Sequence, residues 1–127
     1  MSYFNYFFQL NSFSDKVASS SPNLTNFNWV RDIQGVVVAN PSSQSFTLAP
    51  STSITVFTSA TKKFLYVETD KDLDMTINGI SGLVIKPVVV GSTVQPGTFL
   101  FNSTLTALII TNSSTTATAS VFVASAE

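Results

Sequence analysis

From residue 31 onward, short runs of Val, Ile, Thr and Phe alternate with Pro, Gly, Asn and Ser. Such runs are typical of β-strands, and the residues between them are typical of turns. The runs start roughly 9 to 12 residues apart, which favours a sandwich or jelly roll over alternating helices and strands. We predict strands at residues 33–39, 45–48, 53–58, 63–68, 73–77, 82–90, 98–101, 107–111 and 118–124.

Alternation within the runs predicts which strands have one buried face. Apolar residues occupy the odd-numbered positions of 73–77 and of 117–123, so these strands are expected to be half buried. Residues 36–38 and 108–110 are apolar on both faces, which predicts a second covering layer over them.

Turn residues support the same organisation. Asn78-Gly79 and Ser81-Gly82 adopt positive φ angles at little cost and predict tight turns between the 73–77 and 82–90 strands. A single helical turn is expected near Asp15, with Ser14 as its N-cap. The predicted fold class is therefore all-β, an antiparallel β-sandwich that is jelly-roll-like.

Residues 1–30 have a different texture, because they hold five of the eleven Phe, two of the three Tyr and the only Trp, separated by Asn and Ser. We predict an extended aromatic N-terminal arm at 1–30 and a β-sandwich domain at 31–127. The segment is either a first strand with a flap over the core, or an arm that docks on a partner, since interfaces are enriched in aromatic side chains. The predicted interface residues of the arm are Tyr3, Phe4, Tyr6, Phe7, Phe8, Leu10, Phe13, Phe27 and Trp29.

Composition excludes several classes of function. Without His or Cys, the chain has no zinc site, cysteine nucleophile or His-based triad of its own. The net charge of -1, with no basic run, argues against nucleic-acid binding. No apolar stretch approaches the roughly 20 residues that span a bilayer, and no basic n-region of an export signal precedes the first apolar residues. We expect no enzymatic activity, no cofactor, no metal, no nucleic acid and no membrane partner.

Seven charged residues lie between positions 62 and 74, which predicts a charged hairpin. Its acidic run at 70–74 looks like a calcium loop, but Met75 and Ser81 stand where an EF-hand needs Gly and Glu. The run is therefore interpreted as a solvated turn whose charges block edge-to-edge pairing. Tyr66, Glu68 and Asn78 are the candidates for a saccharide site on a sheet face.

Three glycosylation sequons begin at Asn23, Asn102 and Asn112. Without an export signal, we interpret them as a consequence of the Ser/Thr-rich composition.

Several features of the second half of the chain carry a family resemblance. They are Phe-Leu-Tyr-Val at 64–67, Met-Thr-Ile-Asn-Gly at 75–79, Ile-Lys-Pro at 85–87, Gly-Thr-Phe-Leu-Phe at 97–101, Leu-Ile-Ile-Thr-Asn-Ser at 108–113 and a final Ser/Thr/Ala strand. This part of the chain resembles small β-sandwich structural proteins encoded among the head and tail genes of tailed bacteriophages.

The resemblance implies a non-enzymatic virion structural protein, most specifically a capsid decoration or cement protein that binds and stabilises the outer surface of a phage head. It would be synthesised in the host cytoplasm, and its partners would be the major capsid protein and copies of itself, as a homotrimer. Two alternatives remain open: a head-fibre or tail component that recognises host glycans, and an isolated carbohydrate-binding domain.

The charge content agrees with an assembled role. Only 10% of residues are charged and the mean hydropathy is +0.32, against roughly 25% charged residues in an average soluble domain. After Asp74 the single charged residue before Glu127 is Lys86. A freely diffusing monomer places more charge on its surface, so we expect neighbouring subunits to cover much of this one.

Overall fold

The computed structural model describes residues 2–13, 24–59, 61–101 and 103–127, and all regular secondary structure among them is β. The chain folds into two compact units, Met1–Val38 and Ala39–Glu127. No described residue belongs to a helix long and apolar enough to cross a membrane. The helical turn predicted near Asp15 lies outside the described residues.

The first unit contains one antiparallel pair, β1 (Ser2–Phe13) and β2 (Leu24–Val38). The register runs from Ser2 opposite Val38 to Phe13 opposite Leu24, with two irregularities along it. The strand predicted at 33–39 is therefore the second half of a longer strand that begins at Leu24.

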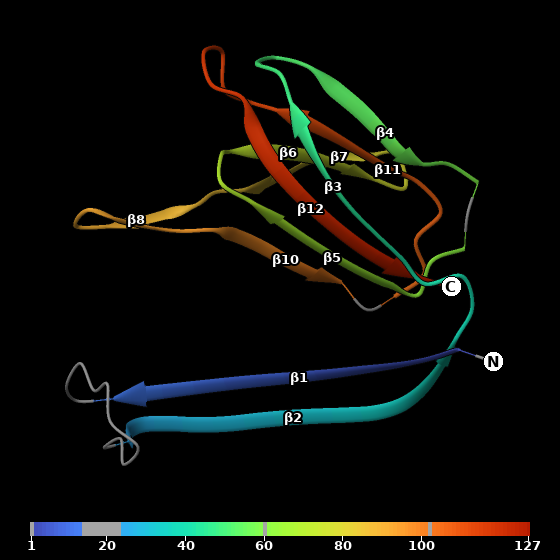
Figure 1. Cartoon of the computed structure of the whole chain (residues 1–127), viewed down its shortest axis with the longest axis vertical. Helices are drawn as coiled ribbons and strands as arrows, with labels where there is room; N and C mark the ends of the chain where they lie inside the picture. Colours follow the sequence, from blue (N-terminus) through green and yellow to red (C-terminus); the bar gives the residue numbers. More distant parts are fainter. Residues whose placement is uncertain (1, 14–23, 60, 102) are drawn as a thin grey trace. The chain divides into compact units, whose positions relative to one another are not determined.

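The second unit is built from two four-stranded antiparallel sheets, shown in Figure 1. The first sheet has the order β10-β5-β12-β3 and the second has the order β4-β11-β6-β7. Their strands are β3 (Ser42–Leu48), β4 (Ser53–Phe57), β5 (Phe64–Thr69), β6 (Leu73–Ile77), β7 (Ile80–Ile85), β10 (Gly97–Phe101), β11 (Leu108–Asn112) and β12 (Ala119–Ala126). A short hairpin of β8 (Val88–Val90) and β9 (Thr93–Gln95) lies between β7 and β10 and projects beyond the sheets (Figure 1).

The two sheets are packed together through one apolar core. Side chains from both sheets meet there, because every second residue of a strand points to the same face. The buried members of the core are Leu48, Leu65, Val67, Leu73, Met75, Ile85, Leu105, Leu108, Ile110, Ala119, Val121 and Val123. The all-β class and the antiparallel pairing predicted from the pattern are thus confirmed for this unit.

The predicted alternation holds on the two strands where it was clearest. Leu73 and Met75 are fully buried and Asp74 is exposed, while Ala119, Val121 and Val123 are buried and Ser120 is exposed. The prediction for 108–110 is wrong in one respect: Ile109 is 36% exposed. Within the unit Ala39–Glu127, the second sheet has a partner sheet on one face only, so no described residue of that unit forms a second layer over Ile109.

Two turn predictions have different outcomes. Asn78 and Gly79 have φ angles of 52° and 80° and join β6 to β7, as predicted. Gly82, with φ of 98°, lies inside β7 and forms no turn. The single strand predicted at 82–90 is broken after Ile85, because Pro87 has no N–H to donate to a sheet.

Glu127 connects both ends of the second unit. Its backbone exchanges two hydrogen bonds of 2.8 Å with Ala39, and its side chain accepts hydrogen bonds from Asn40 Nδ2 at 2.7 Å and Lys62 Nζ at 3.0 Å. These two donors hold the pKa of the Glu127 carboxyl below its ordinary value of 4.5. A carboxylate with a lowered folded-state pKa stabilises the fold above the unfolded-state pKa, and that contribution disappears as the pH falls through the folded-state pKa.

We therefore expect Glu127→Gln to lower the melting temperature slightly at pH 7, and we expect the difference to disappear as the pH falls through the lowered folded-state pKa, below which the wild-type side chain is protonated as well. Thermal unfolding of both chains across this pH range is the measurement. A melting-temperature difference that persists unchanged at low pH would mean that the carboxylate charge contributes nothing.

Candidate functional site

All nine predicted interface residues of the arm lie on the β1–β2 ribbon. β1 contains Tyr3, Phe4, Tyr6, Phe7, Phe8, Leu10 and Phe13, and β2 contains Phe27 and Trp29. The register places Leu10 opposite Trp29 and Phe8 opposite Arg31. The ribbon thus brings the aromatic positions of two sequence segments onto one pair of strands.

A second group of apolar residues, which the sequence analysis did not single out, is exposed on the second unit. We call it the aliphatic surface, and it comprises Ile80, Leu83, Val84, Val88, Val89, Val90 and Val94. Ile80 is 75% exposed, and Val89 and Val90 are each 65% exposed. These side chains belong to β7, an edge strand of the second sheet, and to the β8–β9 hairpin. The Val- and Ile-rich segment at 80–94 predicts strands, but the sequence alone does not show which of its side chains are exposed.

The outer face of the first sheet is of a different kind, since it combines hydroxyls, carboxylates and aromatic rings. Antiparallel pairing places Phe122 of β12 between Glu68 of β5 and Ser45 of β3. The adjacent pair on the same face is Ser120 and Thr47. Because these residues alternate with the buried Val121 and Val67, they point away from the core.

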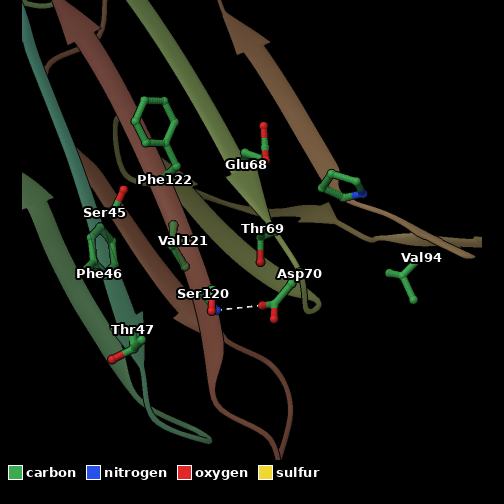
Figure 2. A pocket seen from close by; sticks show the side chains of 11 residues that line it. Ser45, Phe46, Thr47, Glu68, Thr69, Asp70, Val94, Ser120, Val121 and Phe122 are labelled. Carbon is green, nitrogen blue, oxygen red and sulfur yellow. Dashed lines mark hydrogen bonds between the residues drawn. The ribbon is translucent and has the colours of Figure 1, made fainter.

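A groove of about 630 Å³ runs over this face. Figure 2 shows Ser45 and Thr47 on one side of it, Phe122 and Ser120 in the middle, and Glu68 and Asp70 beyond them. Val94 of the β8–β9 hairpin and Pro96 line its far side. Gly97 follows directly, where an added Cβ would lie 2.7 Å from Ile85 Cγ2, so the chain passes too close to β7 for any larger residue.

Hydrogen bonds fix both acidic side chains of the groove. Tyr66 Oη donates to Glu68 Oε2 at 2.7 Å, and burial, with this hydrogen bond and the Glu68 charge, raises the pKa of Tyr66 to about 12. Tyr66 also makes an edge contact with Phe122, at 6.1 Å between ring centroids. Asp70 Oδ1 accepts a hydrogen bond from the Ser120 backbone N–H at 2.7 Å (Figure 2). Both carboxylates are therefore oriented by protein groups alone.

The charged segment at 62–74 is not a hairpin, contrary to the prediction. β5 pairs with β12 and β10 in the first sheet, whereas β6 pairs with β11 and β7 in the second. Residues 70–72 therefore form a crossing between sheets. Among the described residues, no group of three or more acidic side chains is placed to hold a metal ion.

The predicted saccharide residues are only partly brought together. Tyr66 and Glu68 are neighbours on the first sheet, but Asn78 lies in the β6–β7 turn of the second sheet. The Asn78 side chain is engaged there, donating to Thr104 O and accepting from Thr106 N at 2.7 Å. This placement excludes a site composed of all three residues. The chain crosses from the first sheet to the second between β5 and β6, so residues close in sequence become separated in space.

Asn112, the first residue of a glycosylation sequon, has a structural role as a buried hydrogen-bonding side chain. It is fully buried, and its Nδ2 donates to the carbonyl oxygens of Leu48, Ala49 and Ala117 at 2.8 to 3.2 Å. Its Oδ1 accepts from Ser114 N at 3.0 Å. The sequons at Asn23 and Asn102 lie outside the described residues.

The described residues form an all-β protein whose second unit contains two four-stranded antiparallel sheets and exposes an aliphatic surface and a mixed polar and aromatic groove. Comparison with protein-family models, with curated proteins and with solved structures gave no match.

Proposed function

We propose that this chain is a non-enzymatic structural protein of a bacteriophage virion, a decoration or cement protein that binds the outer surface of the head and stabilises it. The observation that carries the proposal is the aliphatic surface, with seven large apolar side chains exposed. Several large apolar side chains exposed on an edge strand and the hairpin that follows it mark a candidate interaction site. A partner that covers them gains about 25 cal/mol for each Å² of apolar surface removed from water.

The strand order supports a jelly-roll β-sandwich as the finer description of the fold. The chain changes sheet between β3, β4, β5 and β6, and again between β10, β11 and β12. Each sheet therefore combines early and late strands, as in the double Greek key of jelly rolls. Jelly rolls occur in viral capsid proteins and in lectins, so this architecture fits a virion role without selecting it.

The β1–β2 ribbon supports an interface role for the N-terminal segment. A two-stranded ribbon alone is marginally stable in water, so its strands gain most from docking on another surface. The partners we propose are the major capsid protein and further copies of this chain, arranged as a trimer on the capsid surface. Many weak contacts repeated around a shell would together give firm attachment. Synthesis would take place in the host cytoplasm.

We expect the double variant Val88→Glu and Val90→Lys to weaken attachment to heads by about tenfold to a hundredfold, because two exposed valines no longer become buried. Val88 and Val90 lie two residues apart on one face of β8, so the opposite charges are neighbours there, and neither residue lines the groove on the first sheet. The measurement is co-sedimentation of the full chain with heads that lack it. The chain without residues 1–27 tests the ribbon in the same assay.

The matched control is Thr118→Glu, a charge added at an exposed residue away from the aliphatic surface. Its attachment should equal that of the wild type. Full occupancy of heads by both the hairpin variant and the shortened chain would contradict the proposal.

A further inference from the structure

The groove on the first sheet is lined by two aromatic rings, Phe46 and Phe122, by four hydroxyl side chains and by two carboxylates. The hydroxyls of Ser45, Thr47 and Ser120 are exposed, whereas that of Thr69 is buried and donates to Lys71 O. Phe122 lies between Ser45 and Glu68 in the register of the sheet (Figure 2). In the part of the chain that the structure describes, no Lys or Arg lines the groove. An anionic ligand would therefore meet the like charges of Glu68 and Asp70, of which only Asp70 has a cation beside it, Lys71 at 3.7 Å.

The carboxylates are also poorly arranged for a metal ion. Asp70 already accepts the Ser120 N–H with one oxygen, and its other oxygen lies 3.7 Å from Lys71 Nζ. Glu68 Oε2 accepts the Tyr66 hydroxyl. Among the described residues of the groove, only Glu68 Oε1 remains as a carboxylate oxygen without a hydrogen bond or an ion pair. A calcium ion needs six to eight oxygen ligands, far more than this.

A neutral polyhydroxy compound fits these groups: the free oxygen of Glu68, the ring of Phe122 and the exposed hydroxyls. A sugar ring has hydroxyl groups that donate to a carboxylate, and a C–H face that packs on the electron-rich face of an aromatic ring. The groove volume of about 630 Å³ lies within the range of small-molecule sites. Tyr66 donates to Glu68 and so keeps the carboxylate in place before a ligand arrives.

We infer that this groove binds a neutral saccharide, with Phe122 as the stacking surface and Glu68 as the main hydrogen-bond acceptor. Ser45, Thr47 and Ser120 supply further hydroxyl contacts along the groove. This inference goes beyond attachment to a head, because the groove lies on the outer face of the first sheet and shares only Val94 with the aliphatic surface. It also bears on the alternative function, recognition of host glycans by a head-fibre or tail component.

The experiment is a nuclear magnetic resonance titration of the full chain, following backbone amide shifts. The probes are neutral oligosaccharides of glucose, mannose, galactose and N-acetylglucosamine, with sialyllactose as an anionic probe and N-acetyl-lysine methylamide and calcium chloride as cationic probes. We expect at least one neutral oligosaccharide to shift the amides of Ser45, Glu68, Ser120 and Phe122 in a saturable way, and the anionic probe to leave them unchanged.

Three variants test the assignment. Phe122→Ala and Glu68→Gln should each weaken binding about tenfold, through loss of the stacking surface and of the charged acceptor. Ser45→Arg should abolish binding by filling the groove from an exposed position, where a substitution has little effect on folding. The matched controls are Asp74→Asn and Thr55→Arg, exposed residues of the second sheet, which should bind as the wild type does.

The inference is overturned if no neutral oligosaccharide shifts the groove amides, or if only the lysine analogue or calcium does so. It is equally overturned if Ser45→Arg and Glu68→Gln bind as tightly as the wild type. Because attachment to heads is measured separately, with changes in the β8–β9 hairpin, either proposal can fail while the other holds.

Discussion

Replacing Asn112 by aspartate is expected to lower the free energy of unfolding by about 4 kcal/mol, although the two side chains have nearly the same shape. The amide nitrogen of Asn112 donates to three carbonyl oxygens, and the side chain is fully buried. A carboxylate in its place would lose all three hydrogen bonds and bring a negative charge against those oxygens. The hydrogen bonds by which the Asn112 side chain links the end of β11 to the end of β3 and to the segment before β12 would be lost.

The matched control for this change is Asn78→Asp. Asn78 is exposed, and the acceptor role of its Oδ1 toward Thr106 and Ala107 is retained by a carboxylate. We expect a loss of less than about 1 kcal/mol there, because water replaces the one donated bond. Urea unfolding of the three chains provides the comparison. Equal losses in both variants would mean that burial of Asn112 has no special energetic role.

Asn112 also illustrates what the sequence could not reveal. Its hydrogen-bond partner Leu48 lies 64 residues away, and no local pattern links the two. The alternation at 73–77, by contrast, depends only on neighbouring residues and on the period of a strand, and it correctly identified the buried face of β6. Local periodicity therefore predicts strands and their faces, whereas contacts between residues far apart in the sequence are revealed only by the structure.

The groove shows the same division. Tyr66 and Glu68 stand two residues apart, so alternation alone placed them on one face, and they were selected as candidates. Phe122 and Ser45 come from strands that are far apart in the sequence, and only the order β5-β12-β3 places them beside Glu68. Asn78 belongs to the segment that follows β5 in the sequence, but β5 and β6 lie in different sheets, so Asn78 is not beside Tyr66 and Glu68.

Adjacent residues of β11 provide the most direct test of the two-sheet arrangement. Ile110 is fully buried in the core between its cross-strand neighbours Ile54 and Met75, whereas Ile109 is 36% exposed on the outer face. Ile110→Ala should cost about 3 to 4 kcal/mol, because it removes buried methylene and methyl groups and leaves a cavity between the sheets. Ile109→Ala should cost less, about 1 kcal/mol, because this side chain is partly exposed and its removal leaves no closed cavity.

Urea unfolding of the two alanine variants measures this difference, and each serves as the control for the other. The same backbone strand, side chain and replacement are compared, so β-propensity contributes equally to both. A loss at Ile109 as large as the loss at Ile110 would indicate that the outer face of β11 is covered in the free protein. A small loss at Ile109 combined with weaker attachment to heads would instead indicate that this side chain becomes buried only on assembly, because burial then adds to binding and not to folding.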